Sequence, residues 1–261
     1  MSYLLVSSDP RGVATVTLNR PEIHNAFDDT LIAELTAALK KLEADKSVRV
    51  VVLTGAGKSF SAGADLNWMK RMAGYTEAQN LEDARRLAEL MRRLNGLNKP
   101  TVALVQGPAY AGGLGLIACC DIAICVDTAN FALTETRLGL APAVVGPYVV
   151  AAIGARAARR YFLSAERFNA HDALRLGLAH MVVAAEDLKA ACESVVAALL
   201  ACAPAALAHA KEQVALLANA RIDDALIDST ARLIAKLRAS PEGREGVASF
   251  LEKRKPAWAK G

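Results

Sequence analysis

The sequence predicts an α/β fold in which helices cover a largely parallel sheet. Composition is the first observation: 53% of the 261 residues are hydrophobic and 22% are charged, which suits one compact domain with a full core. Order is the second, because apolar runs of strand length alternate with stretches of helical periodicity, as in βαβ units. Functional groups in such folds lie on loops at the carboxyl ends of the strands.

The chain opens with a predicted hairpin. Residues 3–6 and 13–18 are strand-like and are separated by Ser-Ser-Asp-Pro-Arg-Gly, which has the composition of a turn. A helix is expected next, because Asp28 and Asp29 are suitable N-cap residues. Four leucines at helical spacing would form its buried face, namely Leu31, Leu35, Leu39 and Leu42.

A strand, a helix and a second strand are predicted after that helix. Residues 50–53 and 102–105 are apolar runs typical of buried strands, and residues 79–94 have helical periodicity between them. The expected core contacts of this helix are Leu81, Leu87, Leu90 and Met91.

The C-terminal part of the sequence changes character at about residue 203. It predicts Ala- and Leu-rich helices over residues 206–217 and 225–238, followed by a charged tail, Glu252 to Lys255. We therefore divide the chain into a core, residues 1–200, and a helical region, residues 201–261, which we interpret as a cap or an oligomer arm.

Charge and cysteine content limit the function classes. The net charge is only +4, from 31 Lys and Arg against 27 Asp and Glu, which argues against a nucleic-acid partner. The most apolar stretch, residues 107–120, is shorter than the ~18 residues that a membrane span needs. We expect a cytoplasmic protein with buried, reduced thiols, because all five cysteines have apolar neighbours (Cys119, Cys120, Cys125, Cys192 and Cys202).

Two glycine-bearing turns follow the buried strands, at residues 60–66 and 107–115. Small residues there allow a ligand to approach the backbone closely. The second turn leads into the apolar run 116–120, a predicted buried helix, so the amides near Gly112 and Gly113 lie at a helix N-terminus with partial positive charge. Such amides suit an oxyanion.

The segments FSAGADL, GPAYAGGLG, CCDIAI and ETRLGLAP, in that order, resemble the crotonase, or enoyl-CoA hydratase/isomerase, superfamily. The likeness includes NRPEIHNAF near the start and EGVASFLEKRKPAW at the end, so it spans nearly the whole chain. It implies a core spiral of ββα turns with a C-terminal helical region that packs trimers, often stacked as hexamers. It also implies that the backbone amides of Ala64 and Gly112 bind the oxygen of an acyl-CoA thioester.

The resemblance further implies a binding site for the CoA part of the substrate. Family members bind the adenine beside the first turn, and the pantetheine and phosphates near the early RP-x-x-x-N-A segment and the C-terminal helix. The corresponding residues are His24, Ala26, Ala62, Asp65, Leu66 and Lys253. No metal or redox cofactor is implied, because coenzyme A belongs to the substrate.

One of the two expected catalytic glutamates is missing. Hydratases of this family usually place two glutamates about the double bond; Glu135 stands at the second position, and Gly115 occupies the first. Burial beside Leu133 and Leu138 is expected to raise the pKa of Glu135, so that it can carry a proton. A single glutamate leaves three alternatives: a hydratase whose water is oriented by other groups, an enoyl-CoA isomerase, and a lyase of the hydratase-aldolase kind.

A closer resemblance favours hydration. The segments VQGPAYAGGLGLIACCDIAI and IGARAARRYFLSAERF are similar to those of bacterial hydratases that act on 3-methylglutaconyl-CoA or its isohexenyl relative. A carboxylate on such a substrate would need a cation, for which the candidates are Lys70, Arg71, Arg85 and Arg86, while Trp68, Met69 and Met72 are candidates for the acyl pocket wall. An acyl-CoA-binding or RNA-binding protein on the same scaffold is the non-enzymatic alternative.

Overall fold

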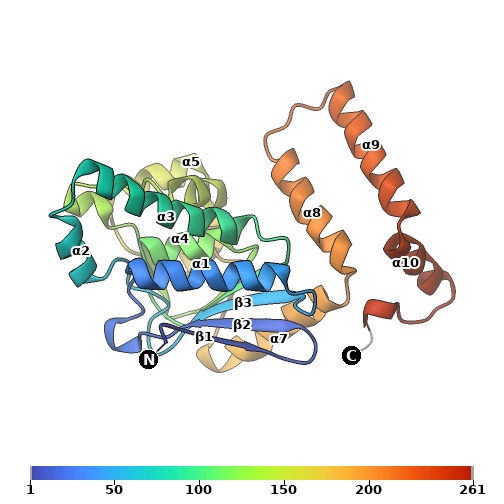
Figure 1. Ribbon diagram of the computed structural model, residues 1–261, viewed down its shortest axis with the longest axis horizontal. Coiled ribbons are helices and arrows are strands. Elements are labelled where there is room, and N and C mark those ends of the chain that lie inside the picture. Colours follow the sequence, from blue (N-terminus) through green and yellow to red (C-terminus); the bar gives the residue numbers. More distant parts are fainter. Residues whose placement is uncertain (1, 260–261) are drawn as a thin grey trace.

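The structure is a computed structural model that describes residues 2–259 (Figure 1). Its main sheet has the strand order β1-β2-β3-β4-β6-β9. All neighbouring strands in it are parallel except β1 and β2, which form the predicted N-terminal hairpin. The strands are β1 (Leu4–Ser8), β2 (Val13–Leu18), β3 (Val50–Gly55), β4 (Thr101–Val105), β6 (Ile122–Val126) and β9 (Met181–Val183).

A second, smaller sheet has the order β5-β7-β8. The chain alternates between the two sheets, because β4 leads into β5 and β6 leads into β7, and a helix follows each pair. This repetition gives the ββα spiral that the family resemblance implied, so the predicted fold class is confirmed. The strands are β5 (Ala109–Tyr110), β7 (Asn130–Ala132) and β8 (Phe168–Asn169).

Helices α1 (Asp29–Ala44) and α3 (Glu77–Asn95) pack against each other beside the main sheet. Helix α1 begins as predicted, because the carboxylate of Asp28 accepts a hydrogen bond from the amide of Leu31 at 2.8 Å. In α3 the prediction for Leu81 was wrong, since its side chain is 49% exposed. The later turns of α3 reach the core, through the buried Leu90, Met91 and Leu94 and the partly buried Leu87.

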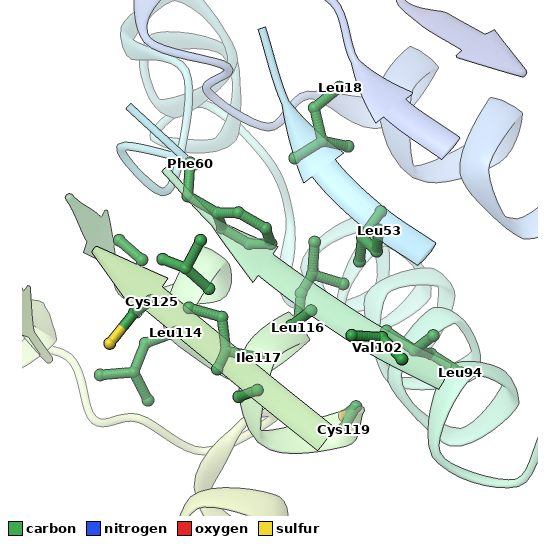
Figure 2. Packing of buried hydrophobic residues seen from close by; sticks show 14 of the residues in the cluster. Leu18, Leu53, Phe60, Leu94, Val102, Leu114, Leu116, Ile117, Cys119 and Cys125 are labelled. Atoms are coloured by element: carbon green, nitrogen blue, oxygen red, sulfur yellow. The ribbon is translucent and has the colours of Figure 1, made fainter. Parts of the chain in front are cut away.

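Helix α4 (Gly112–Cys119) lies at the centre of the molecule and is apolar on all sides, as a helix surrounded by protein must be. Figure 2 shows its side chains Leu114, Leu116, Ile117 and Cys119 packed with residues of the neighbouring strands and with Phe60. Cys119, Cys125 and Cys192 are buried as expected. The prediction was wrong for Cys202, which is exposed because it follows the last turn of α7.

The second half of the chain is mostly helical. In α5 the helix is interrupted at Gly154, whose φ is 74°. Helices α8 and α9 contain no fully buried residue, and Figure 1 shows α8, α9 and α10 extending away from the sheets. The bounds are α5 (Gly146–Ser164), α6 (Ala170–Leu176), α7 (Leu188–Leu200), α8 (Pro204–Leu217), α9 (Asp224–Ala239) and α10 (Pro241–Leu251).

Two helices of this region match the prediction within two residues, whereas α10 was not predicted. The division of the chain at residue 200 remains a prediction. Among residues 2–259, no single helix combines the length and apolar character needed to cross a membrane; the pair Ala185–Ala201 and Pro204–Leu217 passes that test only together and is bent by 104°.

Candidate active site

Three extended segments run side by side and end at the same edge. Ser61 and Ala109 form a parallel bridge, and β5 is parallel to β7. The residues that follow the three segments are therefore neighbours in space, although they lie far apart in the sequence. They are Ala64, Gly112 and Glu135, so the structure brings the three predicted catalytic residues to one edge.

The direction of the Ala64 amide is fixed by two backbone bonds to Phe27. The amide of Phe27 donates to the carbonyl of Gly63 at 2.6 Å, and the amide of Asp65 donates to the carbonyl of Phe27 at 2.7 Å. In a trans peptide the C=O and N–H point in opposite directions, so the N–H of Ala64 points away from Phe27. Within residues 2–259 this N–H has no acceptor.

The amide of Gly112 is fixed in a similar way at the start of α4. The carbonyl of Ala111 accepts from Gly115 inside the helix, so the N–H of Gly112 points out of the helix N-terminus. Ala111 has φ 47°, and its own amide donates to Ala132 of β7 at 2.9 Å. The Gly112 amide likewise lacks an acceptor in the described chain, so both candidate donors are available to a ligand.

Glycine is required in these turns because the backbones approach each other closely. A Cβ on Gly63 would lie 3.1 Å from the Cβ of Ala111, and Gly63 has φ 87°. A Cβ on Gly112 would lie 2.7 Å from the ring of Phe27. The two turns are therefore in contact, which places the two free amides beside each other.

Glu135 begins a short 3-10 helix, η2 (Glu135–Leu138). Its side chain is partly buried, and Oε2 is fully buried without a hydrogen-bond partner in the described chain. Burial raises the pKa of Glu135, as expected from the sequence. Leu133 is buried, but the prediction that Leu138 helps to bury the carboxyl was wrong, because its side chain is 57% exposed.

The sequence and fold of this chain are similar to those of known proteins. The sequence family described as enoyl-CoA hydratase/isomerase matches residues 8–261. The chain belongs to this family. An enoyl-CoA hydratase from Shewanella pealeana is 46% identical and matches with a TM-score of 0.96 over 98% of this chain and 96% of its own.

Two further relatives of this enoyl-CoA hydratase/isomerase cover nearly the whole chain. The 2,3-dehydroadipyl-CoA hydratase of Escherichia coli is 33% identical over 98% of both chains. The structure of Pseudomonas aeruginosa AtuE is 39% identical, with a TM-score of 0.92 over 99% of this chain and 100% of its own. The predicted membership of the crotonase superfamily is thus confirmed.

At the position of the missing glutamate, this family member has no room for a side chain. A Cβ on Gly115 would lie 2.3 Å from Cγ1 and 2.8 Å from Cβ of Val145, and 3.4 Å from Cε of Met91. Val145 is buried and immediately precedes α5. The place that a first glutamate would occupy is therefore filled by an apolar side chain.

The residues predicted to bind CoA fall into two groups. His24, Ala26 and Ala62 lie together near the first turn; the amide of Ala62 donates to the carbonyl of His24 at 2.9 Å. Leu66 is 73% exposed at the start of α2 (Leu66–Met72). Lys253 follows α10, which Figure 1 shows at the opposite end of the molecule from α2, so within one chain it does not join the others.

Asp65 is also beside the first turn, but its carboxylate is already engaged. It accepts from the amides of Asn67 and Trp68 at 2.7 and 3.2 Å and pairs with Arg20 at 3.1 Å. Although burial opposes this, the two amides and the Arg20 charge lower the pKa of Asp65. Its backbone is engaged as well, because its amide donates to the carbonyl of Phe27 and its carbonyl accepts from the amide of Met69.

Of the four candidate cations for a distal substrate carboxylate, one already pairs with an aspartate and two lie in a different groove. Arg71 pairs with Asp29 at 2.6 Å. Arg85 and Arg86 line a groove between α1 and α3, together with residues of α1. Lys70 is exposed and has no ion pair among the described residues. Trp68, a candidate for the pocket wall, is buried.

Two residues of the site were not found by sequence reasoning. Val145 lies 30 positions from Gly115, and no sequence pattern links them. Arg20 is a charged residue that is only 8% exposed, between two acidic helix caps. The aspartate at each cap was a usable signal, because a buried cation beside them is needed to balance two carboxylates.

Proposed function

We propose that this chain adds water across the double bond of a 2-enoyl-CoA. One observation carries the proposal: two free backbone amides, those of Ala64 and Gly112, meet a partly buried carboxyl, that of Glu135, at one edge of parallel segments. The amides would bind the thioester oxygen and stabilise the negative charge that develops on it. The names of the relatives point to the same reaction.

In this mechanism Glu135 carries a proton between water and substrate. Ionised Glu135 accepts a proton from water as the water oxygen bonds to the β-carbon, and the double-bond electrons move toward the thioester oxygen. The protonated carboxyl then donates that proton to the α-carbon. The net change is addition of H and OH, and the thioester is the electron sink, so the proposal invokes no metal or redox cofactor.

A delta-isomerase is the second candidate, and Val145 favours it. Because Val145 fills the space beside Gly115, the described site has no second carboxylate to activate water. One glutamate is sufficient to move a proton between two carbons. Product analysis in deuterated water separates the two reactions, using crotonyl-CoA, 3-methylglutaconyl-CoA and a 3-enoyl-CoA.

A hydratase gives a 3-hydroxyacyl-CoA with deuterium at the α-carbon, and Glu135→Gln removes that product. If only the 3-enoyl thioester reacts, with a shifted double bond and no added oxygen, the hydratase proposal is wrong. RNA binding, the non-enzymatic alternative, would instead appear as affinity that falls steeply with salt.

We also propose a branched or carboxylated acyl group such as 3-methylglutaconyl. The resemblance in the sequence supports it, as does the name of the 2,3-dehydroadipyl-CoA hydratase. Lys70 and Arg85 are the candidate cations without an ion pair in the described chain, and Lys70 is the one that lies on α2, directly after the first turn. Lys70→Met is expected to raise KM for 3-methylglutaconyl-CoA about tenfold and leave KM for crotonyl-CoA unchanged; equal effects on both would contradict this role.

Finally, we propose a homotrimer or hexamer that works in the cytoplasm. The exposed apolar side chains of the helical region support assembly, because surfaces of this kind are usually covered by a partner. Light scattering of the purified protein tests this, and a monomer at micromolar concentration would contradict it. Examples of these side chains are Val214, Leu217, Ile227, Val247 and Phe250.

A further inference from the structure

We propose that Arg20 is a positioning residue for the oxyanion-binding amide of Ala64. The inference rests on the proposed function, because it assigns a role in holding the amide that would bind the thioester oxygen. Arg20 itself does not reach the substrate. It acts through Asp65, the residue next to Ala64.

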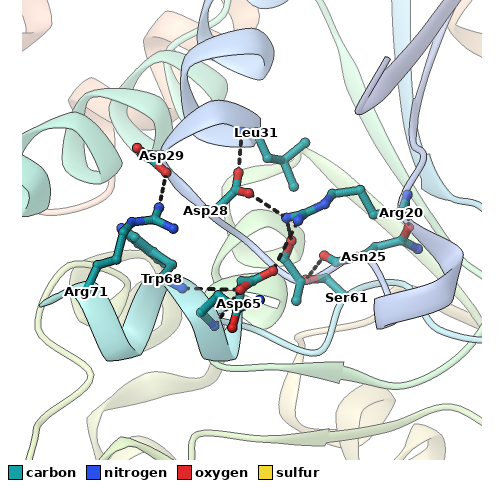
Figure 3. A network of polar contacts seen from close by, with 11 residues as sticks. Arg20, Asn25, Asp28, Asp29, Leu31, Ser61, Asp65, Trp68 and Arg71 are labelled. Carbon is teal, nitrogen blue, oxygen red and sulfur yellow. Dashed lines mark hydrogen bonds and ion pairs between the residues drawn. The ribbon is translucent and has the colours of Figure 1, made fainter. Parts of the chain in front are cut away.

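The guanidinium of Arg20 is largely buried among groups that fix its position. One nitrogen, Nη1, lies 2.9 Å from a carboxylate oxygen of Asp28 and donates to the carbonyl of Ala26 at 2.9 Å. The other, Nη2, donates to Asp65 at 3.1 Å. The ring of Tyr3 covers one face, with its centroid 4.2 Å from Cζ. Figure 3 shows Arg20 between the two aspartates.

Each of these aspartates also starts a helix. Asp28 accepts from the amide of Leu31 and caps α1, while Asp65 accepts from the amides of Asn67 and Trp68 and caps α2. Arg20 therefore fixes the start of α1 relative to the start of α2. The backbone bridge between Phe27 and Ala64 lies between these two starts, one residue before each cap.

The bridge sets the direction of the Ala64 amide, as described above. If Asp65 moves, the bond from its amide to the carbonyl of Phe27 lengthens, and the peptide plane that carries the Ala64 N–H is then held only by the bond from Phe27 to the carbonyl of Gly63, so it can tilt. Hydrogen bonds weaken steeply with misalignment, and a displacement of ~1 Å can cost ~100-fold in rate. Holding this plane still therefore matters more for catalysis than for binding of the CoA part.

The test uses Asp65→Asn and Arg20→Lys. Asn caps a helix about as well as Asp, so Asp65→Asn keeps an acceptor for the α2 amides but replaces the oxygen that accepts from Arg20 with an NH2 donor, which breaks that ion pair. Arg20→Lys keeps the charge and loses the planar fork that bonds to both aspartates. Neither variant removes the packing of the turn.

The matched control is Glu43→Gln. It weakens a comparable cluster in which Arg93 pairs with Glu43 at 3.2 Å and Glu89 at 2.8 Å, between α1 and α3 and away from the Ala64 turn. Thermal unfolding of all three variants shows how much stability each has lost. A general loosening of the fold would affect the control as well.

The readouts are kcat, KM and the absorbance of bound 4-dimethylaminocinnamoyl-CoA, whose band shifts to longer wavelength when its carbonyl accepts strong hydrogen bonds. Asp65→Asn and Arg20→Lys are expected to lower kcat about tenfold, with KM within about twofold, and to reduce the shift; a full loss of one donor costs about 10²–10³. Glu43→Gln is expected to retain both kcat and the shift.

Two results would overturn the inference: an unchanged shift and kcat in the folded variants, or equal losses in the Glu43→Gln control. Failure of the proposed function is distinguishable, because the wild type itself would then neither shift the band nor hydrate an enoyl thioester.

Discussion

The side chain of Glu135 combines two properties that a proton carrier needs. It lies at the edge where the two free amides gather, and burial raises the pKa of its carboxyl. Because Gly115 offers no second carboxylate, the proposed chemistry depends on this one group. A single substitution there should have a large effect.

We expect Glu135→Gln to lower kcat about 10²–10⁴-fold with little change in KM, because the amide cannot carry a proton but fills the same space. Steady-state kinetics with an enoyl-CoA measure this. The matched control is Glu186→Gln, since Glu186 is exposed and remote in sequence from the site. Activity within a factor of three of the wild type would remove Glu135 from the mechanism.

The same residue predicts a pH dependence of stability. The folded-state pKa of Glu135 lies above its ordinary value of 4.5, so the folded protein binds this proton more tightly than the unfolded chain. The protonated Glu135 side chain therefore contributes to stability at pH below about 4.5, and this contribution is lost as pH rises through the folded-state pKa.

We expect Glu135→Gln to be more stable than the wild type at pH 8, because it removes a partly buried negative charge. The difference in free energy of unfolding should shrink as pH is lowered toward 4, which urea titrations at several pH values would show. A difference that grows on acidification would mean that the carboxylate is stabilised in the fold, contrary to its orphaned Oε2.

At the scale of elements, the contact between α4 and the start of α5 decides what the active site contains. Gly115 lets Val145 pack against α4, and the two together leave an apolar wall where the family pattern expects a glutamate. Restoring the glutamate alone therefore creates a steric conflict. The glycine at position 115 and the bulky Val145 therefore depend on each other.

We expect Gly115→Glu to destabilise the fold by about 3 kcal/mol, since its Cβ would lie 2.3 Å from Val145, and to lower Tm by about 6–12 °C. Gly115→Glu with Val145→Gly should recover most of this loss. Gly74→Glu is the control, because a Cβ there meets only a carbonyl at 3.6 Å. Differential scanning calorimetry compares them, and no recovery in the double variant would refute the pairing.

At the scale of the whole molecule, the sequence predicted the features that depend on residues close together in the chain. Asp28 was predicted as an N-cap because capping is a property of one residue and the next turn. Leu81 was predicted in the core and is exposed, because periodicity identifies a face of α3 but not which of its turns the helices α1 and α4 cover. Val145 and Arg20 were missed because their roles arise from contacts across the fold, with Gly115 and with Asp28 and Asp65.

The attachment of the helical region to the core is another long-range feature. Helices α8 and α9 bury no residue fully, and polar contacts join this region to the core. The guanidinium of Arg49, from the residue before β3, donates to the carbonyls of Leu200, Cys202 and Trp258 at 2.8–3.0 Å. Lys211 of α8 adds an ion pair to Asp121 at 2.9 Å.

We expect Arg49→Ala to release this region. Three charge-assisted bonds are lost, which we discount to about 2 kcal/mol in total because the site is partly exposed, so Tm should fall by about 4–8 °C. Limited proteolysis should cut faster in the connection 201–203, between α7 and α8. Arg232→Ala is the control, because Arg232 is exposed and its ion pair among the described residues is with Asp228 of the same helix, α9. Light scattering on the same samples shows whether the oligomer is also lost. If neither the cleavage rate nor the oligomeric state changes, then apolar contacts, and not Arg49, hold the helices in place.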